Sequence, residues 1–118
     1  MRASATVRGT FAASHTIPGH PVCGRDHGHT WEVSVTVEAP VSPKTGSVVD
    51  TASLSVALAT VVAELGHRNL DVMLPGVVST PEGLAMWVRE RLLLAYPNIT
   101  CVTVSNGDYT ASVTWELR

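Results

Sequence analysis

Residues 27–37 read HGHTWEVSVTV and alternate strictly between two kinds of side chain. Odd positions carry imidazole or apolar groups, and even positions carry glycine or polar groups. Successive side chains of a β-strand point to opposite faces, so the pattern predicts a half-buried strand with His27 and His29 on its core-facing side. Side chains two residues apart on a strand lie about 6.5–7 Å apart, and from there two imidazoles can reach one cation. This stretch therefore predicts both a sheet and a candidate metal site.

The preceding segment carries a third imidazole with the same parity. Residues 3–15 predict a strand whose Val7, Phe11, Ala13 and His15 share one face, which places His15 beside His27 and His29. An isolated His-x-His pair usually binds nothing, but the third histidine and Cys23, four residues before the pair, favour a metal site. Three neutral imidazoles with one open position are typical of catalytic zinc, although copper, iron and nickel accept similar ligands. Zinc is the metal that we predict.

Composition limits the function classes. The chain has 118 residues, 45% of them hydrophobic and 15% charged, which predicts one globular domain over residues 1–118. Its formal net charge is −2 with scattered Lys and Arg, so no electrostatic footprint for nucleic acid or an anionic membrane is expected. No apolar run reaches membrane-spanning length and no signal-peptide pattern is present, so we expect a cytoplasmic location. Cys23 and Cys101 are not expected to pair, because Cys101 falls in a predicted core strand, where a buried thiol is ordinary.

Periodicity and turn residues predict the remaining elements. One helix is expected over residues 50–65 with Gly66 at its C′ position. A second helix is expected to begin with Ser79 as N-cap and Glu82 at N3, as a capping box, and to end before Pro97. Strands are predicted over three further ranges: 28–38, 100–106 and 109–117. The order ββααββ indicates an α+β fold, a four-stranded antiparallel sheet with two helices on one face.

Two helices cover only one face of such a sheet. The other face is expected to carry polar side chains, namely Glu32, Ser34, Thr36, Thr103, Ser112, Thr114 and Glu116. It is either the solvent-exposed surface of a monomer or the polar wall of a barrel closed by several subunits, which would also remove the edge strands.

Several motifs together resemble one known family. They are Phe11-Ala-Ala-Ser-His15, Cys23-Gly-Arg-x-His27-Gly-His29, Gly46-x-Val-Val-Asp50, Leu65-x-His67-x-x-Leu70 and Thr80-Pro-Glu-x-Leu-Ala85. Their order and nearly full coverage of the chain resemble the 6-pyruvoyltetrahydropterin synthase and 6-carboxytetrahydropterin synthase family. The loop of Cys23, His27 and His29 with an upstream histidine is the specific part, and the helix motifs are weaker support. The short length is more similar to the bacterial 6-carboxytetrahydropterin synthases of queuosine biosynthesis than to the longer pyruvoyl enzymes.

The resemblance implies a tunnelling fold (T-fold), in which the sheets of three subunits form a twelve-stranded barrel and two trimers stack into a hexamer. It implies zinc at His15, His27 and His29, and a reduced pterin, dihydroneopterin triphosphate, as the small-molecule substrate. Cys23 would move a proton at the side-chain carbon of the substrate, aided by His67 from an Asp-His pair. The resemblance also places Thr80, Glu82 and Asn106 among the substrate-binding positions.

Residue chemistry supports part of this assignment. A thiol four residues before a zinc-binding histidine lies close to a dication, which favours the thiolate as a base. The alternative is an inert loop cysteine. For His67 the alternative is a favourable interaction with the C-terminus of the first helix. His20 matches no motif position and is expected at the surface.

Two positions depart from the family pattern. Gly66 stands where the family has the aspartate of the Asp-His pair, so His67 lacks the carboxylate that would orient it. Asn106 stands where a glutamate clamps the pterin, and an amide cannot supply the charge-assisted bidentate pairing of a carboxylate. Asp26, Asp71 and Asp108 are the candidates for compensating groups.

Three functional hypotheses follow. The first is a zinc-dependent lyase that acts on 7,8-dihydroneopterin triphosphate or a related reduced pterin, as a homo-oligomeric trimer or hexamer. The second is a divergent family member with a different substrate, because uncharged Asn106 would weaken selection for a pterin. The third is a protein that binds zinc or pterin without turnover.

Overall fold

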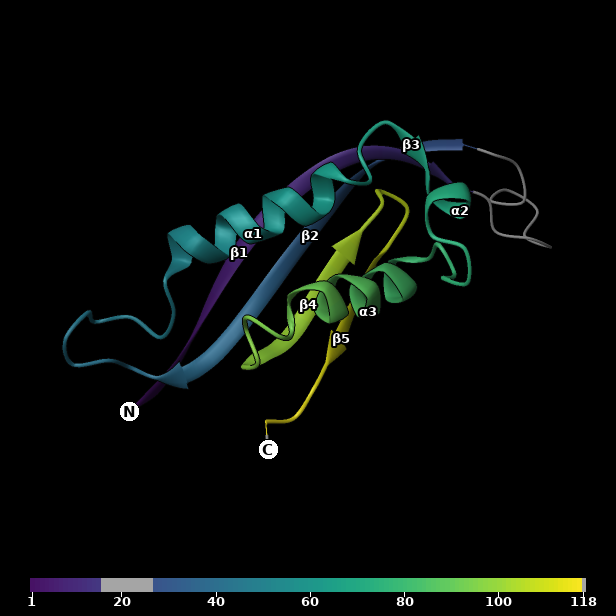
Figure 1. The fold of residues 1–118 in the computed structure, drawn as a ribbon. Helices are drawn as coiled ribbons and strands as arrows, with labels where there is room; N and C mark the ends of the chain where they lie inside the picture. Colours follow the sequence, from purple (N-terminus) through teal and green to yellow (C-terminus); the bar gives the residue numbers. More distant parts are fainter. Residues whose placement is uncertain (16–26, 118) are drawn as a thin grey trace.

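The computed structural model describes residues 1–15 and 27–117, and it confirms the α+β fold class (Figure 1). Its elements are β1 (Arg2–His15), β2 (His27–Pro40), α1 (Thr51–Ala63), β3 (Arg68–Asn69), α2 (Leu70–Met73), α3 (Pro81–Leu92), β4 (Ile99–Ser105) and β5 (Thr110–Thr114). The two short elements, β3 and α2, were not predicted, and β5 ends at Thr114 rather than at residue 117.

The sheet has five strands in the described part of the chain, in the order β3-β1-β2-β4-β5, where four were predicted. The additional strand is β3, whose two residues pair in parallel with Ala13 and Ser14 at the end of β1. The other neighbouring strands pair antiparallel. A strand of two residues is too short to show the alternation by which strands are recognised in a sequence. Only its pairing with β1 in the folded chain defines it.

The predicted hairpin of β1 and β2 is confirmed, and its register positions the site. Ala13 lies opposite His29, and His15 lies opposite His27. Val7, Phe11, Ala13 and His15 are all buried, as their shared parity predicts. The candidate metal site therefore lies at the end of the hairpin where β1 finishes and β2 begins.

Both long helices pack on the same face of the sheet (Figure 1). Helix α1 packs on β1, and α3 packs on β4 and β5. Between the layers lies a core of fully buried side chains that includes Trp31, Leu54, Leu58, Leu84 and Val88. Removal of this apolar surface from water is the main force that joins the layers.

The opposite face of the sheet is polar, as expected. Hydroxyl groups pair across strands on it, with Thr6 Oγ1 2.8 Å from Thr36 Oγ1 and Thr103 Oγ1 2.7 Å from Ser112 Oγ. The prediction of Cys101 as a core residue is wrong, because its parity in β4 matches Thr103, and its free thiol is only half-buried. Its neighbours Thr100 and Val102 point to the core instead.

Helix α1 ends earlier than predicted. Asp50 caps its start by accepting a hydrogen bond from Ser53 N at 3.1 Å, and Glu64 follows its last residue, Ala63. The predicted left-handed cap at Gly66 is wrong, because the positive φ of 59° belongs to His67. The chain needs this turn to reach the sheet, where the backbone N–H of His67 donates to the carbonyl of Ala12.

The start of α3 is also shifted by one residue. Thr80, not Ser79, is the N-cap, and its Oγ1 accepts a hydrogen bond from Gly83 N at 3.1 Å. Pro81 occupies N1, a position where its missing N–H costs nothing. Glu82 is then at N2 and cannot close the predicted capping box, and its carboxylate accepts a hydrogen bond from the hydroxyl of Tyr109 at 2.8 Å.

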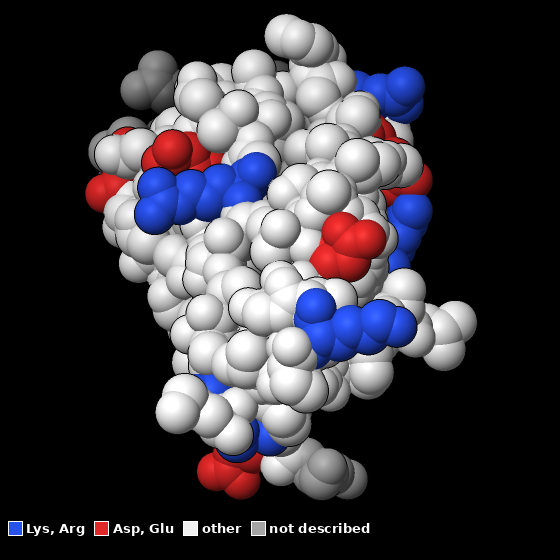
Figure 2. All heavy atoms as spheres, turned by 90° about the vertical axis from the view of Figure 1, so that its left-hand side faces the viewer, with Lys and Arg blue, Asp and Glu red and all other residues white. Residues whose placement is uncertain are grey.

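The charged side chains are distributed as composition predicts. On the face shown in Figure 2, basic and acidic side chains are interspersed, and neither sign forms a broad patch. In the described residues no helix is long and apolar enough to cross a membrane.

Candidate functional site

Two imidazoles meet at the end of the hairpin. The ring centroids of His15 and His29 are 5.0 Å apart, and the rings are at 67° to each other. His15 is fully buried, whereas His29 is partly exposed. The indole of Trp31 stands edge-on to both rings, with centroids 4.9 Å from His15 and 5.9 Å from His29. This packing leaves the two imidazoles little freedom to rotate apart.

The tautomer of His15 follows from its contact with Ser79. His15 Nδ1 lies 2.6 Å from the carbonyl oxygen of Ser79. A carbonyl only accepts hydrogen bonds, so Nδ1 carries the proton, and in the neutral imidazole Nε2 then carries the lone pair. A histidine that donates one ring N–H to a backbone carbonyl is the usual form of a metal ligand.

Of the candidate compensating carboxylates, Asp108 contacts an imidazole directly and Asp71 contacts Ser79. Asp108 Oδ2, in the turn between β4 and β5, is 3.4 Å from His29 Nε2. Asp71 Oδ1 accepts a hydrogen bond from Ser79 Oγ at 2.7 Å, so it contacts the residue whose carbonyl bonds to His15. The third candidate, Asp26, lies outside the described residues.

His67 lies close to one of the two imidazoles, that of His29. Its exposed side chain lines a hollow of about 550 Å³ together with Ser14, Gly28, His29, Thr30 and Arg68. The structure therefore brings a predicted metal ligand, His29, and a predicted catalytic residue, His67, to one surface. The backbone of His67 has a positive φ of 59°, and its N–H donates to the carbonyl of Ala12.

The three predicted substrate-binding residues lie at the start of α3 and beyond β4, and all have structural contacts. Thr80 caps α3, and Glu82 bonds to Tyr109. Asn106 is only 2% exposed, and its Oδ1 accepts hydrogen bonds from Asp108 N at 3.0 Å and Tyr109 N at 3.2 Å. The Nδ2 of Asn106 is buried and has no hydrogen-bond partner among the residues that the structure describes.

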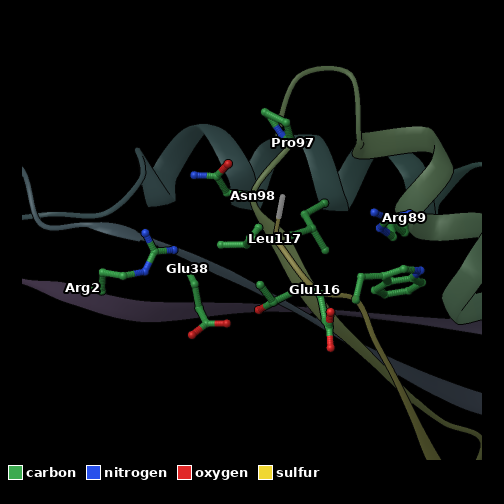
Figure 3. A pocket seen from close by; sticks show the side chains of 10 residues that line it. Arg2, Glu38, Arg89, Pro97, Asn98, Glu116 and Leu117 are labelled. Carbon is green, nitrogen blue, oxygen red and sulfur yellow. The ribbon is translucent and has the colours of Figure 1, made fainter.

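Figure 3 shows a larger hollow, of about 780 Å³, whose lining includes Arg2, Glu38 and Arg89. It is lined by Arg2 at the start of β1 and Glu38 near the end of β2, so it sits at the opposite end of the hairpin. The guanidinium of Arg89 lies 4.4 Å from the ring centroid of Trp115 there. Its lining contains no histidine or cysteine, so size alone does not identify the functional site.

Comparison with known proteins gives the chain a family. A family model described as 6-pyruvoyl tetrahydropterin synthase matches residues 4–116. The chain belongs to this family.

Curated relatives of the pterin synthase family differ in the reaction that they are named for. The chain is 30% identical over 99 residues to a protein of Archaeoglobus fulgidus that carries the name of a 6-carboxy-5,6,7,8-tetrahydropterin synthase, covering 84% of each chain. It is 35% identical over 92 residues to the dihydroneopterin monophosphate aldolase of Pyrococcus furiosus, covering 78% of this chain and 76% of the relative. Pterin synthases and an aldolase therefore stand among the relatives of this chain.

A solved structure confirms the T-fold of this pterin synthase family member. The Caenorhabditis elegans 6-pyruvoyl tetrahydropterin synthase superposes with a TM-score of 0.88 over 98% of this chain and 97% of that chain. The two sequences are 22% identical, so the likeness concerns the fold.

The donor set of this family member fits a zinc ion. His15 and His29 project from adjacent strands, and the carbonyl of Ser79 keeps Nε2 of His15 as a lone-pair donor. Within residues 1–15 and 27–117 no three His, Cys, Asp or Glu side chains form a metal cluster. The side chain of the third predicted ligand, His27, and the whole of Cys23 fall outside the described part.

Sequence reasoning missed Ser79 as a site residue. Its place before a helix suggested a cap, yet its carbonyl and hydroxyl face His15 and Asp71. The sequence feature that could have indicated this is the Thr80-Pro81 pair. Proline is common at N1, so Thr80 can be the N-cap in place of Ser79, and Ser79 is then available for other contacts.

Proposed function

We propose that the protein is a zinc-dependent lyase that acts on 7,8-dihydroneopterin triphosphate or a related reduced pterin. The observation that carries this proposal is the pair of His15 and His29, edge to face at 5.0 Å, with His15 in its metal-binding tautomer. The family membership supports a pterin as the substrate class. Zinc would be held by His15, His29 and His27, whose backbone lies opposite His15 in the hairpin.

Bound zinc supplies Lewis acidity, which polarises the hydroxyl groups of the substrate side chain. The chain itself supplies the groups that move protons. Cys23 is proposed to take the proton from the side-chain carbon, and His67 is proposed to assist from the hollow that it shares with His29. Gly66 provides no carboxylate to orient the imidazole of His67, and the hydrogen bond from His67 N to Ala12 O holds only its backbone in place.

Turnover is tested by incubating the zinc-loaded protein with dihydroneopterin triphosphate and, separately, with the monophosphate, and identifying products by mass spectrometry. We expect a carboxy- or pyruvoyl-tetrahydropterin from the triphosphate. Cys23→Ser is expected to lower the rate by about a hundredfold or more, the usual contribution of a general acid or base. Cys101→Ser is the matched control, because that thiol lies on the polar sheet face, and it should retain the rate. Absence of any product from either substrate contradicts the lyase and leaves a binding protein.

A second candidate function is a lyase whose substrate carries a ring other than a pterin. The hydrogen bonding of the Asn106 amide favours it. Two backbone N–H groups fix its Oδ1, so the group left buried and unbonded is the donor Nδ2. A buried donor without an acceptor is costly, at about 1–3 kcal/mol. The donor edge of a pterin, its 2-amino and N3–H groups, cannot supply that acceptor. A ring that carries a 2-oxo group can.

Asn106→Asp distinguishes the two rings, because it exchanges the donor for an acceptor of the same size. If the substrate is a pterin, the new carboxylate should tighten binding of sepiapterin several-fold, since a charge-assisted hydrogen bond is worth about 1.5–3 kcal/mol against about 1 for a neutral one. Binding of lumazine, which has a 2-oxo group, should weaken. The measurement is fluorescence titration of both ligands. Unchanged affinities for both would show that Asn106 does not face the ligand, and weaker sepiapterin binding would support a ring other than a pterin.

We also propose that the chain assembles into a trimer or hexamer and acts in the cytoplasm. The exposed long edge of β1, the edge strand β5 and the polar sheet face are the features that barrel closure would cover. Multi-angle light scattering at micromolar concentration should report a trimeric or hexameric mass. A monomeric mass would exclude an active site shared between subunits.

A further inference from the structure

We propose that Asp71 and Ser79 are positioning residues that hold His15 in the orientation and tautomer required to bind the metal. This inference rests on the proposed zinc site. It assigns a role to Ser79, which was expected only as a helix cap, and a specific role to Asp71, which was expected only as a candidate for a compensating group. The geometry is a continuous chain of two hydrogen bonds, from Asp71 through Ser79 to His15.

The first bond fixes the histidine. Ser79 O accepts the Nδ1 proton of His15 at 2.6 Å, across 64 positions of the sequence. Both residues are buried, at 0% exposure for His15 and 2% for Ser79, so water does not compete for this bond. The direction of the Ser79 carbonyl therefore sets the direction of the Nε2 lone pair.

The second bond fixes the carbonyl. Ser79 lies just before Thr80, the N-cap of α3. Its peptide group is therefore outside the helix and is not held by the hydrogen bonds of the helix. Its hydroxyl instead donates to Asp71 Oδ1 at 2.7 Å. A hydrogen bond to a charged acceptor is short and strong, so Asp71 anchors the residue whose carbonyl orients His15.

Asp71 is itself held on a docked segment. Its backbone N–H donates to Asn69 Oδ1 at 2.9 Å at the start of α2. The buried side chains of Leu70 and Leu74 fasten α2 to the core, and β3 pairs with the end of β1. The anchor is therefore joined to the same strand that ends in His15.

This arrangement also joins the metal site to the proposed proton-transfer residue. His67 begins the same segment, four positions before Asp71, and its backbone N–H bonds to Ala12 on β1. One short stretch, residues 67–71, thus positions His67 directly and His15 through Ser79. A single shift of this stretch would displace both groups together.

The test compares zinc affinity, by chelator competition, and the visible absorption bands of the Co²⁺-substituted protein. Ser79→Ala and Asp71→Ala should each weaken zinc binding roughly tenfold to a hundredfold, the usual effect of losing a group that orients a metal ligand. Each should also shift the Co²⁺ bands, because the imidazole reorients. Asp71→Asn keeps the Oδ1 acceptor and should remain within about threefold of wild type. That rescue separates the hydrogen bond from the negative charge of Asp71.

Asp50→Ala is the matched control, because it removes another exposed carboxylate that accepts a hydrogen bond, here from Ser53 N at the start of α1, far from the site. It should lower stability while leaving zinc affinity and the Co²⁺ spectrum unchanged. Asp71 is exposed, so Asp71→Ala carries the test if Ser79→Ala does not fold. Affinity within twofold of wild type and unchanged Co²⁺ bands in Asp71→Ala overturn the positioning role. Zinc binding that is equal in wild type and His15→Ala overturns the proposed zinc site itself.

Discussion

Replacing His15 with alanine is expected to lower zinc affinity by at least about a hundredfold, because a lost ligand costs more than the roughly tenfold to hundredfold of a lost orienting group. His29→Ala should have a similar effect on zinc, and both variants should lose lyase activity. The two should differ in stability, since His15 is fully buried and packs against Trp31, whereas His29 is partly exposed. Metal analysis after dialysis and thermal unfolding of the zinc-free proteins measure the two effects separately.

His20→Ala is the matched imidazole control for these variants, because His20 belongs to none of the site motifs. It should keep its zinc. Full zinc occupancy in the His27→Ala/His29→Ala double variant would place the metal elsewhere in the chain and remove the basis of the proposed chemistry.

The parts of the site that lie on long strands could be predicted from sequence. Strict alternation over residues 27–37 and over the odd positions up to His15 fixes which side chains share a face. The hairpin register then brings His15 and His29 together. Periodicity over many residues indicates a secondary-structure element strongly, because every position adds independent evidence for which face is buried and which is exposed.

The parts that lie on short segments could not be predicted. Strand β3 has two residues and α2 has four, which is too few for any period to show. The positive φ of His67 arises from the hydrogen bond of its N–H to Ala12, a contact between distant parts of the chain. Ser79 and Asp108 reach the imidazoles only because α3 and the β4–β5 turn pack at that end of the sheet. Tertiary packing, rather than local preference, therefore places the groups around the two histidines.

Gly83→Ala should destabilise the protein by about 2–3 kcal/mol, although alanine normally favours a helix over glycine by about 1 kcal/mol. A Cβ at this position would overlap the carbonyl oxygen of Val78 and lie 3.0 Å from its carbonyl carbon. These are backbone atoms, so relief requires movement of residues 78–80. That stretch carries the carbonyl that holds His15 and the hydroxyl that caps α3.

Thermal unfolding should show the midpoint of Gly83→Ala lowered by about 10 °C, given roughly 4 °C per kcal/mol for a domain of this size. Zinc affinity should fall as well, because the Ser79 carbonyl moves away from His15. Gly66→Ala is the matched control, since the nearest atom to its Cβ would be Ala63 O at 3.8 Å, an ordinary contact, and its φ is not positive. The midpoint of thermal unfolding of that variant should lie within about 2 °C of wild type. This corresponds to the change of about ±0.5 kcal/mol in stability that is usual for a neutral substitution. A Gly83→Ala protein as stable as wild type would mean that the turn into α3 has room for a side chain, and the close packing that aims the Ser79 carbonyl at His15 would be absent.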